Sequence, residues 1–228
     1  LGRDGRPYRT RSGDTVGLEN LLDEAVGKAY AVVVENDQRK PEPEMSEEER
    51  MQVARVVGHG AIKYADLSHN RTSDYEFDTD KMLALEGNTA TYLQYSYARV
   101  QSIFRRAEVD ARRQSQQVTT FDLGHAAERA LALQLLRFSE ALEEVLVDFR
   151  PNQLTDYLFK IAQMYSVFFE HCPVLKAETD GLRHSRLALS DLTSRTMQQG
   201  LVSNFLVFST CFLLTTGIQI QTIQHVQC

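Results

Sequence analysis

Apolar residues recur every three or four positions along most of the chain, which is the spacing of amphipathic helices. The pattern predicts a first helix that begins near Asp14 or Thr15, either of which is a suitable cap, and a charged linker with two prolines over residues 36–44. The Ser-Glu-Glu-Glu sequence that starts at Ser46 has the form of a capping box. It predicts a second helix that reaches about Leu67.

The second predicted helix contains Gly58 and Gly60, which either permit close packing against another helix or mark a kink. Residues 69–77 are polar and predict a loop. Helical periodicity then returns over residues 78–85, 89–112, 121–149, 153–171 and 180–199. Gly200 is expected to end the last helix as a left-handed cap. Because strand signals are scarce, the sequence predicts an all-α helical bundle.

The predicted helix over residues 89–112 has two distinct faces. An advance of about 100° per residue places an apolar stripe on the core side, made of Leu93, Tyr97, Val100, Phe104 and Ala107. A second face combines two aromatic rings with two guanidinium groups, those of Tyr92, Tyr95, Arg99 and Arg106. Rings that stack on unpaired bases and cations that meet phosphates are what single-stranded RNA recognition requires. The alternative is that both tyrosines pack under a neighbouring helix while the arginines are solvated.

The composition restricts how the chain could meet nucleic acid. Its 228 residues are 43% hydrophobic and 25% charged, enough for a full core, and the formal net charge is −6. An acidic body does not attract nucleic acid in general, so RNA binding would depend on local basic patches and no DNA partner is expected. Two patches are present, Arg3, Arg6, Arg9 and Arg11 near the start and Arg99, Arg105, Arg106, Arg112 and Arg113 in the middle.

Cysteine usage indicates a reducing compartment. Cys172, Cys211 and Cys228 are odd in number and lack the spacing of a disulfide framework, so we expect a cytoplasmic protein. His and Cys residues show no paired ligand spacing, and no metal site is predicted. The chain opens with neither a signal peptide nor Met, which makes Leu1 look like an internal cut and the chain a fragment.

The stretch GAIKYADLSHNRTSDY at residues 60–75, followed by DKML at 80–83 and GNTATYLQYSYAR at 87–99, closely resembles the arginyl-tRNA synthetases. In that family this block joins the class I catalytic core to the helical domain that binds the anticodon. The resemblance implies ATP-dependent attachment of arginine to its tRNA by the intact enzyme, with Mg²⁺ accompanying ATP. It also favours an RNA contact for at least one of the two tyrosines. We expect Tyr92 and Tyr95 to contact the anticodon, Arg99 to support them through a phosphate, and Arg106 to be a further tRNA contact.

The opening loop resembles the family's version of the class I signature loop. The sequence Arg-Thr-Arg-Ser-Gly at residues 9–13 stands where other class I members have KMSKS, which implies that Arg9, Arg11 and Ser12 contact the ATP phosphates. A HIGH-type motif, which class I enzymes also need, is missing. We therefore expect this chain alone to bind no cofactor and to have no aminoacylation activity.

The sequence RHSRLALSDLTSRTMQQGL at residues 183–201 resembles the helix that names the anticodon-binding fold. Arg183, Arg186 and Arg195 either reach a phosphate of the tRNA or close salt bridges between helices. Arg183 is the one that we expect to contact tRNA. For Arg186 we favour the salt bridge, because such a helix mainly organises the bundle.

The resemblance divides the chain into three parts: the end of the catalytic core with its signature loop and connecting helices (1–78), the anticodon-binding helical domain (79–200) and an uncharged tail (201–228). No Asp, Glu, Lys or Arg follows Arg195, and the tail departs from the family pattern. A shifted reading frame or an unnatural end is favoured over a lineage-specific extension. A membrane anchor is less favoured, since Ser, Asn, Thr and Gln interrupt the apolar run.

A second hypothesis is a non-catalytic helical module, derived from a synthetase, that binds RNA or protein. The ATP, arginine and tRNA partners belong to the first hypothesis, and the absence of a long heptad seam favours a monomer.

Overall fold

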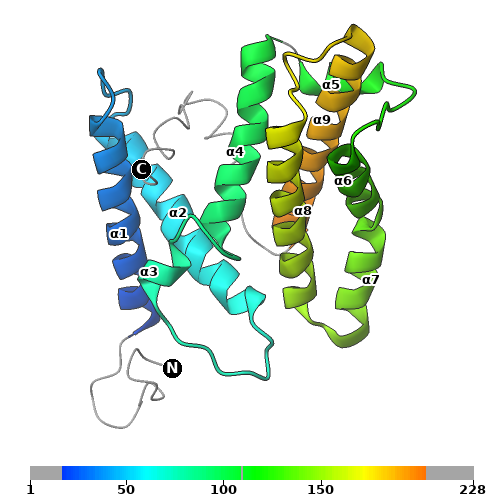
Figure 1. Ribbon diagram of the computed structural model, residues 1–228. Coiled ribbons are helices and arrows are strands. Elements are labelled where there is room, and N and C mark those ends of the chain that lie inside the picture. Colours follow the sequence, from blue (N-terminus) through cyan, green and yellow to red (C-terminus); the bar gives the residue numbers. More distant parts are fainter. Residues whose placement is uncertain (1–16, 109, 204–228) are drawn as a thin grey trace. The chain divides into compact units, whose positions relative to one another are not determined.

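The computed structural model describes residues 17–108 and 110–203, which form helices joined by loops, with no strand among them. The contacts between Cα atoms divide these residues into two compact units, one up to Tyr92 and one from Leu93 onward. Figure 1 shows the helices of each unit. The all-α prediction is confirmed for the described residues.

The first unit is built on two long helices, α1 (Leu18–Gln38) and α2 (Glu47–Ser68). The two backbones pack so closely that a Cβ added at Gly58 would lie 2.8 Å from the backbone nitrogen of Val26 and 2.9 Å from the carbonyl oxygen of Ala25. Gly58 therefore permits close helix packing, one of the two roles that its position suggested. The helix α1 begins after Gly17, and the predicted caps Asp14 and Thr15 lie outside the described residues.

The capping box at the start of α2 is confirmed. The Glu49 amide donates to Ser46 Oγ at 3.3 Å, and the Ser46 amide donates to Glu49 Oε2 at 2.8 Å. Two backbone donors that the helix itself leaves without partners are thus satisfied by local side chains. The helix ends at Ser68, one residue beyond the predicted end.

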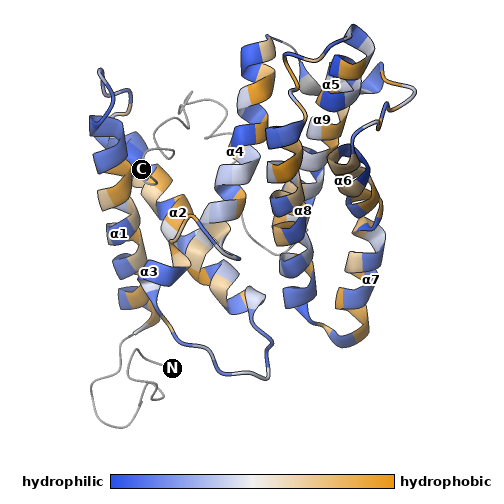
Figure 2. Cartoon of the chain, viewed as in Figure 1, coloured by the Kyte–Doolittle hydropathy of each residue, from blue (hydrophilic) through white to orange (hydrophobic). Residues whose placement is uncertain are grey.

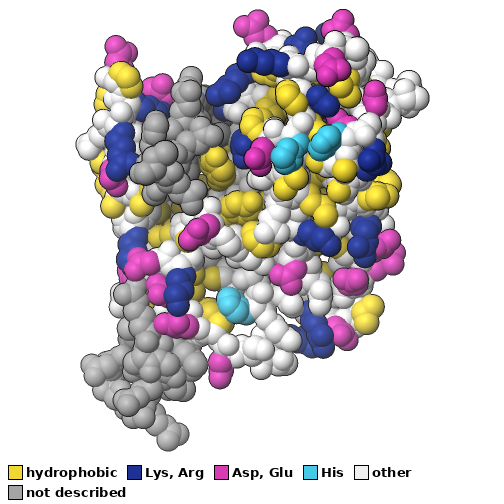
Figure 3. All heavy atoms as spheres, viewed as in Figure 1, with side chains coloured by type: hydrophobic (Ala, Val, Ile, Leu, Met, Phe, Trp, Pro, Cys, Tyr) yellow, Lys and Arg dark blue, Asp and Glu magenta, His cyan; other side chains and the backbone are white. Residues whose placement is uncertain are grey.

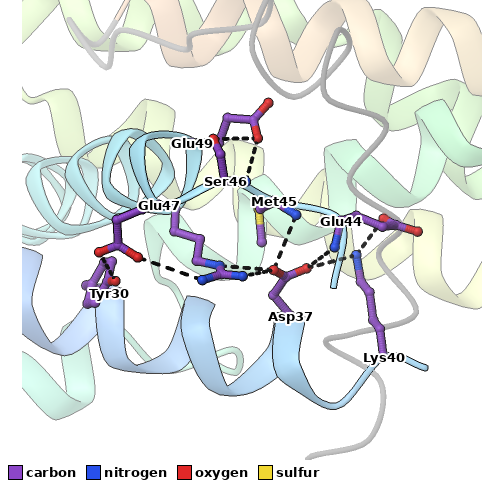
Figure 4. Close-up of polar contacts among 9 residues, drawn as sticks. Tyr30, Asp37, Lys40, Glu44, Met45, Ser46, Glu47 and Glu49 are labelled. Atoms are coloured by element: carbon purple, nitrogen blue, oxygen red, sulfur yellow. Dashed lines mark hydrogen bonds and ion pairs between the residues drawn. The ribbon is translucent and has the colours of Figure 1, made fainter. Parts of the chain in front are cut away.

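The predicted linker over residues 36–44 is wrong at its beginning, because α1 continues to Gln38 and Asp37 is fully buried. The Asp37 carboxylate accepts hydrogen bonds from the amides of Glu44 at 3.0 Å and Met45 at 3.3 Å, and from Arg50 Nε at 3.0 Å (Figure 4). Burial alone would raise the pKa of Asp37, but these hydrogen bonds and the Arg50 charge outweigh it and hold the pKa below its usual value. A segment that looks solvated by composition is therefore organised around one buried carboxylate.

The segment between α2 and the short helix α3 (Thr79–Met82) is the predicted loop. Figure 2 shows this connection as mostly hydrophilic, but Tyr75 and Phe77 near its end pack against a buried cluster that includes Met82. Asp78 caps α3, accepting from the amides of Asp80 and Lys81 at 3.0 and 3.4 Å. The helix ends at Met82, before the predicted Leu85.

The second unit contains most of α4 (Ala90–Ala107) and all of α5 (Ala111–Gln116), α6 (Ala126–Leu136), α7 (Phe138–Asp148), α8 (Pro151–His171) and α9 (Asp180–Ser203). Two predicted helices are each divided. The one over residues 89–112 stops at Ala107, because Glu108 adopts a left-handed conformation with φ of 54°. The one over 121–149 is interrupted at Arg137, which separates α6 from α7.

Helices α8 and α9 pack tightly in the second unit. The prediction that Gly200 caps the last helix is wrong, because α9 continues to Ser203. A Cβ added at Gly200 would lie 2.6 Å from Leu158 Cδ2, so this glycine brings α9 close to α8. The core of the second unit includes fully buried side chains from α6, α8 and α9, namely Leu131, Leu158, Ile161, Phe168, Leu187 and Leu189.

No helix in the described part of the chain is long and apolar enough to cross a membrane.

Candidate functional site

The core side of α4 agrees with the predicted apolar stripe. Leu93, Tyr97, Val100 and Phe104 are at most 5% exposed, and Ala107 is half-buried. Burial, with a smaller contribution from the Asp191 carboxylate, raises the pKa of the Tyr97 hydroxyl above its ordinary value. Tyr97 is therefore a protonated core residue at neutral pH.

The second face of α4 is only partly covered. Tyr92, Tyr95 and Arg99 are half-buried, whereas Arg106 in the last turn is exposed. The two tyrosines are thus intermediate between the buried Tyr97 and a free surface residue. Their spacing of three residues places them on one side of α4, with Arg99 one turn beyond Tyr95.

Arg99 has a defined contact within the second unit. Its Cζ lies 4.1 Å from the centroid of the Phe169 ring of α8, the geometry of a cation–π interaction. Its Nε is buried and has no hydrogen-bond partner. The guanidinium group therefore lies over the Phe169 ring.

Basic residues are close together in the sequence around the end of α4. Arg105 and Arg106 occupy its last turn, and Arg113 lies in the last turn of the following α5. All three side chains are exposed. Figure 3 shows Lys and Arg side chains side by side at this end of the second unit. Such a cluster provides the local positive charge that an acidic chain needs to meet a phosphate backbone.

The arginines of α9 have different partners. Arg186 Nε donates to Glu128 Oε1 of α6 at 2.7 Å, and its Nη1 donates to the Pro173 carbonyl oxygen at 2.9 Å. Arg195 pairs with Asp191 one turn earlier at 3.0 Å. The favoured salt-bridge hypothesis for Arg186 is confirmed. Arg183 is half-buried, and its Nε has no hydrogen-bond partner.

Glu128 is a residue that the sequence pattern did not single out. Its Oε2 accepts from the His125 amide at 2.8 Å, while the His125 ring nitrogen Nδ1 accepts from the Ala127 amide at 3.1 Å. This is a capping box with His in the cap position, where Ser or Thr is usual. The sequence signal for this capping box is the glutamate three residues after the cap position. The same 1% exposed carboxylate pairs with Arg186, so Glu128 both caps α6 and fixes α9 to it.

The phosphate-loop candidates Arg9, Arg11 and Ser12 lie outside the described residues, as does the tail after Ser203. Among the described residues, no group of three or more His, Cys, Asp or Glu side chains is arranged to hold a metal ion.

Comparison with known proteins matches two family models to successive parts of the chain. A class I tRNA synthetase catalytic-domain model, the arginine type, matches residues 1–79. The DALR anticodon binding domain matches residues 93–203. The second match begins at residue 93, where the second compact unit also begins.

Curated relatives are similar over most of the chain. The arginine–tRNA ligase of Rhodopirellula baltica is 52% identical over 210 residues, covering 88% of this chain and 31% of the relative. That of Proteus mirabilis is 50% identical over 201 residues, covering 88% and 34%. The chain thus spans about a third of the length of these relatives.

Solved structures show the same similarity in three dimensions. Thermus thermophilus arginyl-tRNA synthetase aligns with a TM-score of 0.72 at 31% identity, covering 86% of this chain and 32% of that one. The Plasmodium falciparum arginyl-tRNA synthetase aligns with a TM-score of 0.70 at 26% identity, covering 83% and 32%.

Proposed function

The chain belongs to the arginyl-tRNA synthetase family, and from this membership we propose that it forms the tRNA-binding and ATP-loop part of an arginine–tRNA ligase. The intact enzyme would activate arginine with ATP and transfer it to the 3′ end of its tRNA. The observation that supports this most directly is the succession of the two family matches along one chain. We further propose that the enzyme is a cytoplasmic monomer.

The anticodon side of this function is assigned to the second face of α4. The partly exposed rings of Tyr92 and Tyr95 offer stacking surfaces for unpaired bases. Arg99 and Arg106, together with Arg183 of α9, provide positive charge for the RNA backbone. In contrast, Arg186 serves the bundle through its ion pair with Glu128.

The nucleotide side of this function is assigned to Arg9, Arg11 and Ser12 from the family resemblance. Cationic groups near a triphosphate stabilise the negative charge that develops when arginine is activated. Mg²⁺ would accompany ATP in the intact enzyme. We assign no other residue of this chain to the nucleotide.

Replacing both Tyr92 and Tyr95 by Ala is expected to weaken binding of an arginine tRNA anticodon stem-loop. Base stacking on an aromatic side chain contributes about 1–3 kcal/mol per base, so one lost stack alone lowers affinity roughly fivefold or more. The measurement is fluorescence anisotropy with a labelled stem-loop, after circular dichroism has shown that the variant is folded. The matched control is Tyr75→Ala, a half-buried tyrosine of the first unit that lies outside α4. A folded double variant with unchanged affinity would mean that both rings serve packing instead.

The purified chain is expected to bind tRNA without charging it, because the HIGH-type half of the class I active site is not in its sequence. Radiolabelled arginine, ATP, Mg²⁺ and tRNA measure this directly, with a full-length arginine–tRNA ligase as the positive control. Detectable arginyl-tRNA above the no-enzyme background would contradict the proposal.

The rival function, a non-catalytic RNA- or protein-binding module, differs in its genetic context. A start codon directly before Leu1 would favour that module, and an upstream coding region with a HIGH-type motif would favour the enzyme.

A further inference from the structure

Phe169 of α8 packs against Arg99, which belongs to the second face of α4. The guanidinium carbon lies 4.1 Å from the ring centroid, and both side chains are half-buried. We propose that Phe169 is a positioning residue for RNA binding, holding the guanidinium of Arg99 so that its N–H edge meets a backbone phosphate. This inference rests on the proposed function, because it requires that α4 contacts tRNA.

Aromatic side chains of the core pack against the Phe169 ring. Its centroid is 6.4 Å from that of Tyr165, which packs at 5.6 Å against Phe168. Tyr165 and Phe168 are at most 1% exposed, and the Tyr165 hydroxyl lies 3.4 Å from Ser190 Oγ of α9. A row of contacts therefore runs from α9 through α8 to Arg99, and the outermost ring cannot tilt freely without disturbing buried ones.

A stacked guanidinium keeps its ability to bind phosphate. Stacking uses the flat face of the group, whereas its N–H donors lie in its plane. Because the Arg99 Nε is buried, the donors on its two terminal nitrogens are the ones that we assign to the phosphate. No ion pair between Arg99 and a carboxylate occurs in the described part of the chain, whereas Arg186 and Arg195 are each paired with one. The charge of Arg99 is thus not neutralised by a carboxylate among the described residues.

If Phe169 holds the Arg99 side chain in place before RNA binds, the binding should be stronger. A free arginine loses rotamer freedom when it closes on a ligand, and a side chain already immobilised by a ring loses less. Phe169 would then contribute to RNA affinity without touching RNA. A merely structural role would instead affect stability, or affect binding equally whether Arg99 is present or absent.

The test is a double-mutant cycle in the full chain with Phe169→Leu, Arg99→Ala and both together. Binding of a labelled arginine anticodon stem-loop is measured by anisotropy over a series of salt concentrations. Phe169→Leu is expected to weaken binding by about three- to tenfold, the range that a cation–π contact supports. Arg99→Ala is expected to reduce the slope of log K against log salt by about 0.7–0.9, the value for one lost phosphate contact. The double variant should bind as Arg99→Ala does.

Two controls separate positioning from charge and from folding. Lys160→Ala removes one exposed cation from the same helix α8 and should leave affinity close to wild type. Phe169→Tyr keeps a stacking ring and should restore binding relative to Phe169→Leu. Urea unfolding of each variant confirms that the comparison is between folded proteins.

Wild-type affinity in Phe169→Leu, or a Phe169→Leu effect that persists fully in the Arg99→Ala background, would overturn the positioning role and leave the proposed function intact. Wild-type affinity and salt slope in Arg99→Ala would overturn the phosphate contact, and with it the positioning role. Failure of the wild-type chain to bind the stem-loop would overturn the proposed function and this inference together.

Discussion

Arg186→Ala is expected to lower the free energy of unfolding by about 3–5 kcal/mol, the cost of leaving one member of a buried ion pair without its partner. The Arg186 side chain is 11% exposed and the Glu128 side chain 1%, with 2.7 Å between Nε and Oε1. Removing the guanidinium leaves the buried carboxylate of Glu128 without its opposite charge. It also removes the hydrogen bond to the Pro173 carbonyl, which connects α9 to the chain segment after α8. Urea unfolding followed by far-UV circular dichroism at neutral pH measures the effect.

The matched control is Arg195→Ala on the same helix. Arg195 is 52% exposed and pairs with Asp191 one turn away, so its loss should cost less than about 1 kcal/mol. Comparable losses for the two variants would contradict the assignment of Arg186 as a clamp between α6 and α9. Normal stability of Arg186→Ala with weakened tRNA binding would instead make Arg186 a tRNA contact.

Asp37→Asn is expected to lower the free energy of unfolding by about 3 kcal/mol at neutral pH, since it removes the negative charge that the buried site is built to hold. The carboxylate accepts from the Glu44 and Met45 amides and pairs with Arg50 Nη2 at 2.9 Å. An amide has one acceptor oxygen and an NH₂ group, so it cannot accept on both sides. One donor would then face the NH₂ group of the new side chain.

The pH dependence of this effect has a definite sign. The folded-state pKa of Asp37 is lower than usual, so its contribution is present above the unfolded-state pKa of about 3.9 and is lost as pH falls through the folded value. The difference in stability between wild type and Asp37→Asn should therefore be constant from neutral pH to about pH 5 and shrink below about pH 4. Glu35→Ala, two residues earlier on α1 and in an exposed pair with Arg39, is the control and should change stability little. A wild-type advantage that grows on acidification would contradict the assignment.

Local signals predicted the local features of the fold. The capping box at Ser46 and the apolar stripe of α4 depend on residues within one or two helical turns, and both are present. The divisions after Ala107 and at Arg137 were missed, because a short break does not disturb the apolar period on either side of it. Gly200 was misjudged for a different reason. Glycine serves equally at a helix end and at a close helix contact, and only the neighbouring Leu158 distinguishes them.

For the candidate site, too, the sequence predicted relations within one helix but not contacts between helices. Sequence spacing placed Tyr92, Tyr95 and Arg99 on one side of a helix, because a helix converts spacing directly into direction. It could not find Phe169, which meets Arg99 from another helix seventy residues away in the chain. Nor could it match Glu128 to Arg186 or place Asp37 beneath Arg50.

The sequence by itself determined the family, through the resemblance carried by residues 60–99. It also determined the helical class and the residues that face together along each helix, since these follow from short-range order. Only the tertiary structure decided which charges are buried, which arginines are paired with carboxylates and which one rests on an aromatic ring. The physical reason is that desolvation and pairing depend on groups brought together by packing, often from distant parts of the chain. The same residue type therefore serves as a clamp at Arg186, as a surface pair at Arg195 and as a proposed RNA contact at Arg99.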